Sequence, residues 1–239
     1  MAASFAGDST TFAATQMPKV IIPLKPKNLA EAKKLISRAE KLADIIEIWL
    51  DGITDLNPEK VAAIVKFAKK PLILNLKDKK EKGSFRGNSL ARFQLLTKSK
   101  ATYVDLPLSF PVKLIQRFRK ENPKTKLILS FHDFAKMPSL QAFRQLAKKA
   151  SQQKADVVKL VGFARNYSDN LSILQISHEL STAKKSFLTI AMGEKGEITR
   201  IITPLFGGLG MFALLDAKNK TAAGQIPVFE LKQLWEKLM

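Results

Sequence analysis

Residues 126–139 read KLILSFHDFAKMPS and residues 154–164 read KADVVKLVGFA, two short apolar runs on either side of a helical pattern. A run such as Val157–Val161, bounded by polar residues, is typical of a parallel strand that is buried on both faces. Each run also carries one polar residue in apolar surroundings, His132 in the first and Lys159 in the second. The stretch therefore predicts a strand–helix–strand unit with a candidate reactive side chain on each strand.

Lys159 has two interpretations. An ammonium group is costly to bury, so we expect the pKa of a lysine inside a buried strand to fall. The neutral amine is then nucleophilic near neutral pH and can form a Schiff base with a carbonyl compound. In the other interpretation, the stem of the lysine packs at the strand end while its ammonium group reaches solvent. The apolar run alone leaves both open.

The composition limits the classes of function. The chain has 239 residues, 46% of them hydrophobic, which is enough for one large domain with a substantial core. There is no cysteine, so disulfides and thiolate metal sites are excluded, and two histidines argue against a histidine-based metal cluster. No apolar run approaches the ~18 residues that a membrane-spanning helix requires. We therefore expect neither a metal site nor a membrane segment.

The formal net charge is +19, and nucleic-acid binding through a basic surface is one interpretation of it. A basic surface can bind nucleic acid, but that function usually shows a dense basic tract with interleaved aromatic residues. In this chain the lysines are spread along the whole sequence. A scattered lysine surface is more often only a solvated face, and a small anionic substrate would also benefit from the positive field, so nucleic acid is not the expected partner.

Apolar runs alternate with amphipathic helical patterns from about residue 20 to the end. Strict alternation implies an α/β fold with parallel strands and right-handed crossovers, and eight units in about 220 residues fit a closed (β/α)₈ barrel. An open doubly wound sheet is the alternative, although no glycine-rich fingerprint follows the first strand. We expect one barrel domain over residues 18–239, after a disordered tail over residues 1–17 that lacks Lys and Arg. The predicted strands cover residues 20–23, 44–50, 72–76, 103–106, 126–130, 157–161, 187–191 and 210–215.

Active sites of such barrels gather at the carboxyl ends of the strands. Six motifs at these ends, in register from Lys19 onward, together resemble type I 3-dehydroquinate dehydratase, the Schiff-base enzyme of the shikimate pathway for aromatic amino-acid and chorismate biosynthesis. The resemblance implies a (β/α)₈ barrel lyase that needs no metal and no diffusible cofactor. The motifs are ADIIEIWLDGI (43–53), the Lys77–Glu81 loop, ILSFHDF (128–134), ADVVKL (155–160), AMGEKGEITR (191–200) and TAAGQI (221–226).

The resemblance implies three catalytic residues. Lys159 would form an imine with the C3 ketone of 3-dehydroquinate, which makes the C2 proton acidic. His132 would remove that proton and deliver it to the departing C1 hydroxyl, two roles that suit a group with a pKa near neutral pH. Glu81 matches the carboxylate that orients the histidine.

The resemblance also implies the substrate-binding residues. Arg200 matches the arginine that binds the substrate carboxylate, Thr221 and Gln225 match the loop that closes over the substrate, and Glu47 matches a carboxylate that bonds substrate hydroxyls. Lys77 stands where the family usually has an arginine. Met192-Gly193 matches a motif for which packing and turn geometry are sufficient explanations. A cytoplasmic location and a homodimer are the expectations that follow from the family.

Several positions depart from the family pattern. Trp49 stands where a second substrate-binding arginine is usual, and Pro107 replaces a usual glutamate. Three hypotheses remain: an active dehydratase with an altered pocket, an imine-forming lyase for a different hydroxy-keto acid, or a barrel that has lost the reaction and binds through its basic surface. Further departures are Lys82 for a glycine, Gly208 for a serine and Ala223 for a proline.

Overall fold

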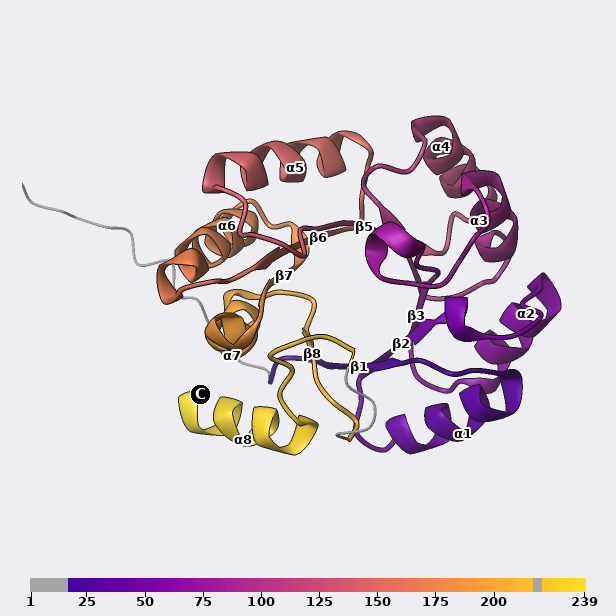
Figure 1. The fold of residues 1–239 in the computed structure, drawn as a ribbon, viewed down its shortest axis with the longest axis horizontal. Coiled ribbons are helices and arrows are strands. Elements are labelled where there is room, and N and C mark those ends of the chain that lie inside the picture. Colours follow the sequence, from indigo (N-terminus) through magenta and orange to yellow (C-terminus); the bar gives the residue numbers. More distant parts are fainter. Residues whose placement is uncertain (1–16, 217–220) are drawn as a thin grey trace, which may run out of the picture.

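The computed structural model describes residues 17–216 and 221–239. Eight parallel strands form a nearly closed central barrel, and helices surround it (Figure 1). The strands pair in the order β7-β6-β5-β4-β3-β2-β1-β8. The predicted single-domain (β/α)₈ barrel is therefore confirmed, and the open doubly wound sheet is wrong. The strands are β1 (Val20–Leu24), β2 (Ile45–Trp49), β3 (Leu72–Asn75), β4 (Tyr103–Pro107), β5 (Lys126–His132), β6 (Val157–Phe163), β7 (Ser186–Met192) and β8 (Met211–Phe212).

The helices follow the strands in turn, and polar caps fix where several of them begin. Asn28 accepts a hydrogen bond from the backbone N–H of Glu31, and Ser139 accepts one from the backbone N–H of Ala142, so these two residues are the N-caps of their helices. The helices are α1 (Leu29–Ala39), α2 (Pro58–Phe67), α3 (Ser89–Leu96), α4 (Val112–Glu121), α5 (Leu140–Gln152), α6 (Asn170–Thr182), α7 (Glu197–Ile202) and α8 (Val228–Leu238).

Strand β8 is shorter than the predicted run at residues 210–215. Met211 and Phe212 pair with β1, but Leu214 turns away from the sheet, accepts a hydrogen bond from the backbone of Val228 and donates one to Ile226. On the other side of β8, the backbone N–H of Leu209 donates to the carbonyl of Phe187 on β7 at 2.8 Å. The segment around β8 thus closes the barrel and holds the loop before α8.

Strands β5 and β6 are two residues longer at their carboxyl ends than predicted. His132 is consequently the last residue of β5 and pairs with Val161, while Lys159 pairs with Ser130 deeper in the barrel. Side chains alternate along a strand, so Lys159, Val161 and Phe163 all point to the same face. This periodicity directs the lysine into the barrel interior and places it below the carboxyl end.

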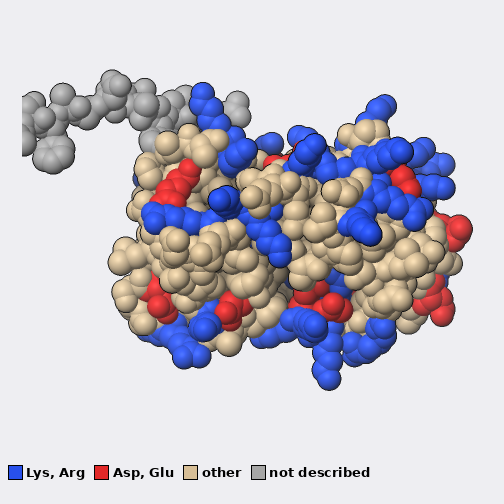
Figure 2. Space-filling view, turned by 90° about the horizontal axis from the view of Figure 1, so that it is seen from above, with Lys and Arg blue, Asp and Glu red and all other residues tan. Residues whose placement is uncertain are grey.

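Two other expectations concern the surface of the barrel. Of the predicted tail at residues 1–17, only Met17 lies within the described residues, so the prediction of disorder stays untested. On the face shown in Figure 2, lysine and arginine side chains are scattered across the surface, with acidic and uncharged areas between them. Across residues 17–216 and 221–239, no helix is long and apolar enough to cross a membrane, and no group of three or more potential metal ligands occurs.

Candidate active site

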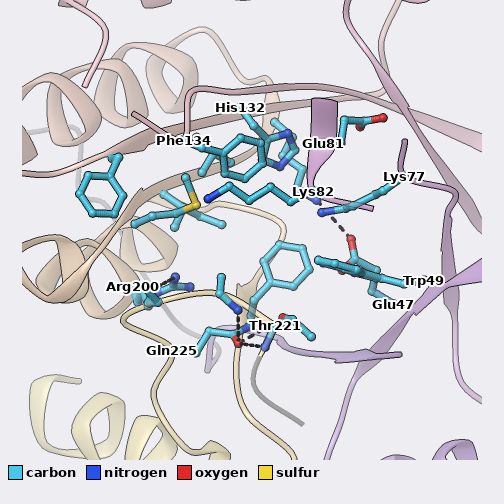
Figure 3. A pocket seen from close by; sticks show the side chains of 18 of the residues that line it. Glu47, Trp49, Lys77, Glu81, Lys82, His132, Phe134, Arg200, Thr221 and Gln225 are labelled. Atoms are coloured by element: carbon cyan, nitrogen blue, oxygen red, sulfur yellow. Dashed lines mark hydrogen bonds and ion pairs between the residues drawn. The ribbon is translucent and has the colours of Figure 1, made fainter. Parts of the chain in front are cut away.

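A pocket of about 310 Å³ opens at the carboxyl ends of the strands. Its walls come from strands β2, β5, β6, β7 and β8 and from loops that follow several of the strands, including β1 and β3. Figure 3 shows these side chains converging on one cavity. All eight residues that the sequence proposed for the site line this pocket: Glu47, Lys77, Glu81, His132, Lys159, Arg200, Thr221 and Gln225.

Lys159 is paired with two buried carboxylates. Its Nζ lies 2.7 Å from Oδ2 of Asp105 on β4 and 3.2 Å from Oε1 of Glu47 on β2. All three side chains are at most 4% exposed. The second interpretation from sequence, a lysine whose head reaches solvent, is therefore wrong.

The protonation of Lys159 differs from the sequence prediction. Burial alone would lower the pKa of the ammonium group, but the charges and hydrogen bonds of Asp105 and Glu47 outweigh it and raise the pKa above its usual value. The prediction of a lowered pKa is thus wrong for the ligand-free protein. The physical reason is that two carboxylates from distant strands reach the lysine, which burial alone did not indicate.

Glu47 is held by several donors at once. Trp49 donates its Nε1–H to Oε2 of Glu47 at 2.6 Å, and Nδ2 of Asn75 lies 3.3 Å from Oε1. Burial would raise the pKa of Glu47, but the positive charges of Lys159 and Lys77 and these hydrogen bonds lower it below its usual value. Glu47 is therefore a carboxylate that faces both the pocket and the buried lysine.

His132 lines the pocket as a neutral imidazole. Burial and the positive charges of Lys77 and Lys159 hold its pKa well below the usual value. The imidazole stacks on the ring of Phe134, with centroids 5.6 Å apart and planes 6° from parallel. The Nζ of Lys82 lies 4.6 Å from the centre of the Phe134 ring. A neutral histidine with a fixed ring orientation can accept a proton at neutral pH.

Glu81 lies in the pocket wall but is bonded to an arginine. Its Oε2 accepts a hydrogen bond from Nη1 of Arg92 at 2.9 Å, and the same guanidinium contacts Asp78 at 3.1 Å. Burial raises the pKa of Glu81, against the charge of Arg92. Within the described part of the chain, no hydrogen bond joins Glu81 to His132. The role expected from the resemblance, orienting the histidine, is thus not visible as a contact.

Arg200 and the loop before α8 form the opposite end of the pocket. The guanidinium of Arg200 is 1% exposed and donates from Nη2 to the carbonyl of Ala223 at 3.0 Å. Burial lowers its pKa to about 10. Its Nε is buried without a hydrogen-bond partner among the described residues. A buried, partly unsatisfied guanidinium is suited to a ligand carboxylate.

Gln225 organises this loop. Its Oε1 accepts hydrogen bonds from the backbone and hydroxyl of Thr221, at 2.8 and 3.1 Å, and from the backbone of Ala222 at 3.0 Å. The loop packs against the turn after β7, where Gly193 has a φ of +88° that glycine adopts without strain. A Cβ on Gly224 would lie 2.5 Å from the Gly193 carbonyl. The two turns therefore fit together only with small residues.

Sequence reasoning missed several residues of the site. Asp105 and Asn75 lie in YVDLP and LILNL, where a polar residue inside an apolar strand was the same signal that selected Lys159. Lys25 directly follows β1 and lines the pocket. Arg92 is on α3, and no local signal distinguishes it from a surface arginine.

The fold and this site define a (β/α)₈-barrel enzyme with a buried lysine at its centre. The sequence model described as Type I 3-dehydroquinase matches residues 20–238. The chain is 33% identical over 230 residues to a 3-dehydroquinate dehydratase of Methanosarcina mazei, covering 92% of this chain and 94% of the relative. It is 32% identical over 221 residues to that of Methanocaldococcus jannaschii, covering 90% and 97%.

Among solved structures, a 3-dehydroquinate dehydratase from Geobacillus kaustophilus has the same fold, with a TM-score of 0.85 at 21% identity over 93% of this chain and 91% of that one. The chain therefore belongs to the type I 3-dehydroquinase family. It is a hydro-lyase of the shikimate pathway, as the resemblance implied.

Proposed function

We propose that this protein eliminates water from 3-dehydroquinate through an imine on Lys159, with His132 as general acid and base, to give 3-dehydroshikimate. The observation that carries the proposal is the arrangement of Lys159, a buried lysine that reaches the pocket between two carboxylates. A substrate that enters the pocket can therefore meet the amine of Lys159.

In the first step the neutral amine of Lys159 attacks the C3 ketone, and the carbonyl oxygen leaves as water. Asp105 and Glu47 favour the ammonium form of Lys159, so the ammonium group must first transfer a proton to a carboxylate or to water. The same carboxylates then stabilise the protonated imine, because its positive charge lies at the same nitrogen. The free-energy cost of deprotonating Lys159 is thus offset by the stabilisation of the protonated imine.

In the second step the protonated imine withdraws electrons and the C2–H bond breaks. His132 accepts the proton and an enamine forms. The enamine electrons then expel the C1 hydroxyl, to which His132 returns the proton, so one water leaves. Hydrolysis of the remaining imine releases 3-dehydroshikimate and restores the amine. The lowered pKa keeps His132 neutral and free to accept a proton, but it also makes the imidazole a weaker base than a histidine with a pKa near neutral pH.

The remaining residues are assigned to substrate binding. The planar guanidinium of Arg200 binds the substrate carboxylate with two parallel hydrogen bonds. Gln225 and Thr221 belong to the loop that closes over the substrate. Glu47 and Lys77 face the substrate hydroxyl groups from β2 and from the residues after β3. Glu81, which lines the same pocket as His132 and pairs with Arg92, is kept in the proposal as the catalytic carboxylate that orients the histidine. The proposal includes a cytoplasmic location, where the pathway's small anionic substrate would be available, and leaves the homodimer as a prediction.

The test has two parts. Purified protein mixed with 3-dehydroquinate should produce the ultraviolet absorbance of the conjugated enone product, and borohydride added during turnover should inactivate the protein and leave a reduced adduct on Lys159, located by mass spectrometry. Lys159→Ala should abolish turnover, whereas Lys184→Ala at an exposed lysine should not. Substantial turnover in Lys159→Ala, or no adduct on Lys159 in the active wild-type protein, would refute the imine.

A further inference from the structure

Two lysines stack on one tryptophan in the pocket wall. The Nζ of Lys25 lies 4.0 Å from the centre of the Trp49 ring, and the Nζ of Lys77 lies 3.8 Å from the same centre. An ammonium group at this distance is attracted by the electron-rich face of an indole. The ring is itself fixed, because its Nε1 donates to Glu47 at 2.6 Å. Trp49 thus holds both ammonium groups at one wall of the pocket.

Neither ammonium group has an acceptor of its own. Within residues 17–216 and 221–239, Lys25 Nζ and Lys77 Nζ make no hydrogen bond and no ion pair, in contrast to Lys159 with its two carboxylates. Lys77 is only 5% exposed. Burial lowers the pKa of Lys25 and of Lys77. Lys25 is exposed and Lys77 lines the same pocket, so both ammonium groups are open to the cavity, where a ligand that supplies oxygen atoms can accept hydrogen bonds from them.

The position of this wall indicates which part of a ligand it would meet. Figure 3 shows Trp49 and Lys77 across the cavity from Arg200, which is suited to a carboxylate. The wall also contains Glu47, a hydrogen-bond acceptor. A hydroxyl group both donates and accepts hydrogen bonds, so ammonium donors beside a carboxylate acceptor suit neighbouring hydroxyl groups on one ring.

We propose that Lys25, held on the Trp49 ring beside Lys77, is a substrate-binding residue that donates hydrogen bonds to ring hydroxyl groups of the substrate, at the end of the pocket opposite Arg200. The inference rests on the proposed function, because it assigns one end of the same substrate. It gives Lys25 a role in specificity for hydroxylated ring acids, and Trp49 the role of positioning it.

Lys25→Met tests the proposal, with Lys27→Met as the matched control. Both variants remove one exposed positive charge after β1, but only Lys25 lines the pocket. Loss of a charged hydrogen bond corresponds to roughly a tenfold or larger effect. Lys25→Met should therefore raise KM for 3-dehydroquinate at least about tenfold with kcat within about twofold, and Lys25→Arg should recover most of the loss. Lys27→Met should match the wild-type protein.

A second set of variants tests the role of Trp49. Trp49→Phe keeps an aromatic face for Lys25, whereas Trp49→Leu removes it. If the ring positions Lys25, adding Lys25→Met to Trp49→Leu should change KM by less than about twofold, although the same change is costly in the wild-type protein. Fully additive effects of the two substitutions would contradict the positioning role.

The outcomes separate the inference from the proposed function. A wild-type protein that turns over 3-dehydroquinate, with the same KM in Lys25→Met, would overturn only the role of Lys25. A folded wild-type protein without turnover would overturn the proposed function. In that case calorimetric binding of 3-dehydroquinate to the wild-type, Lys25→Met and Lys27→Met proteins decides the inference, and equal affinities or no binding at all would reject it.

Discussion

The Nζ of Lys159 lies 2.7 Å from Oδ2 of Asp105, across the barrel interior from β6 to β4. This pair joins residues that are 54 positions apart in the chain. It favours the ammonium form of the lysine, yet imine formation requires the neutral amine. In the proposed mechanism the carboxylate would therefore oppose the start of the reaction and stabilise the cationic imine that follows.

Asp105→Asn should shift the pH dependence of imine formation to lower pH. Removing the carboxylate removes a cause that raises the pKa of Lys159, so a larger fraction of the lysine is neutral at a given pH. The measurement is the initial rate of borohydride trapping with 3-dehydroquinate as a function of pH. The free energy of unfolding should also fall, by up to about 3–5 kcal/mol for a broken buried pair. Asp55→Asn, at an exposed position, should change neither quantity, and an unshifted trapping profile in Asp105→Asn would contradict the assignment.

His132→Gln should weaken the pH dependence of stability and nearly abolish activity. The folded-state pKa of His132 lies below the value of 6.5 expected after unfolding, so the unfolded chain binds more protons between the two values. The stability that this histidine contributes is present above pH 6.5 and is lost as pH falls towards its folded pKa. Between pH 7.5 and pH 5, the midpoint temperature of thermal unfolding should therefore fall less in the variant than in the wild-type protein.

The activity of His132→Gln should fall by about 10²–10⁴-fold, the usual contribution of a general acid–base group. The chain has one other histidine, His178 on α6, which is exposed. His178→Gln is the matched control and should keep the wild-type rate. Identical behaviour of the two variants would contradict a special role for His132.

Arg92→Met should destabilise the protein because it leaves Glu81 as a buried carboxylate without its partner. Breaking a buried pair from one side costs about 3–5 kcal/mol, whereas exposed pairs contribute about 0–1 kcal/mol. Chemical denaturation provides the measurement, and Arg144→Met, which breaks the exposed pair with Glu179, is the control. Adding Glu81→Gln to Arg92→Met should recover part of the lost stability. No recovery would show that Arg92 acts by packing and not by pairing.

Arg200→Lys should raise KM for 3-dehydroquinate by about ten- to hundredfold with a smaller change in kcat. Lysine keeps the positive charge but lacks the planar guanidinium that binds a carboxylate through two hydrogen bonds. It also loses the Nη2 contact to Ala223 that fixes the loop. Steady-state kinetics checks this, with Arg86→Lys at an exposed position as the control. A KM within twofold of the wild-type value would remove Arg200 from the binding site.

Much of the fold could be predicted because its signals are local. The run around Lys159 is apolar on both sides, and the Asn28 and Ser139 caps follow from side-chain chemistry within three residues. The extent of β8 could not be predicted, because Leu214 pairs with the loop before α8 and not with the sheet. The partners of Glu81 also depend on packing, since Arg92 comes from a different element.

The sequence by itself determined the alternation of strands and helices, and with it the barrel and the set of polar residues at its carboxyl end. Only the tertiary structure decided which of these polar residues lie close together and in which direction their pKa values shift. Glu47 and Asp105 lie 112 and 54 positions before Lys159, and their charges reverse the effect that burial alone has on its pKa. Periodicity acts over a few residues and can be read along the chain, whereas a charge acts over distances in space that the fold must first create.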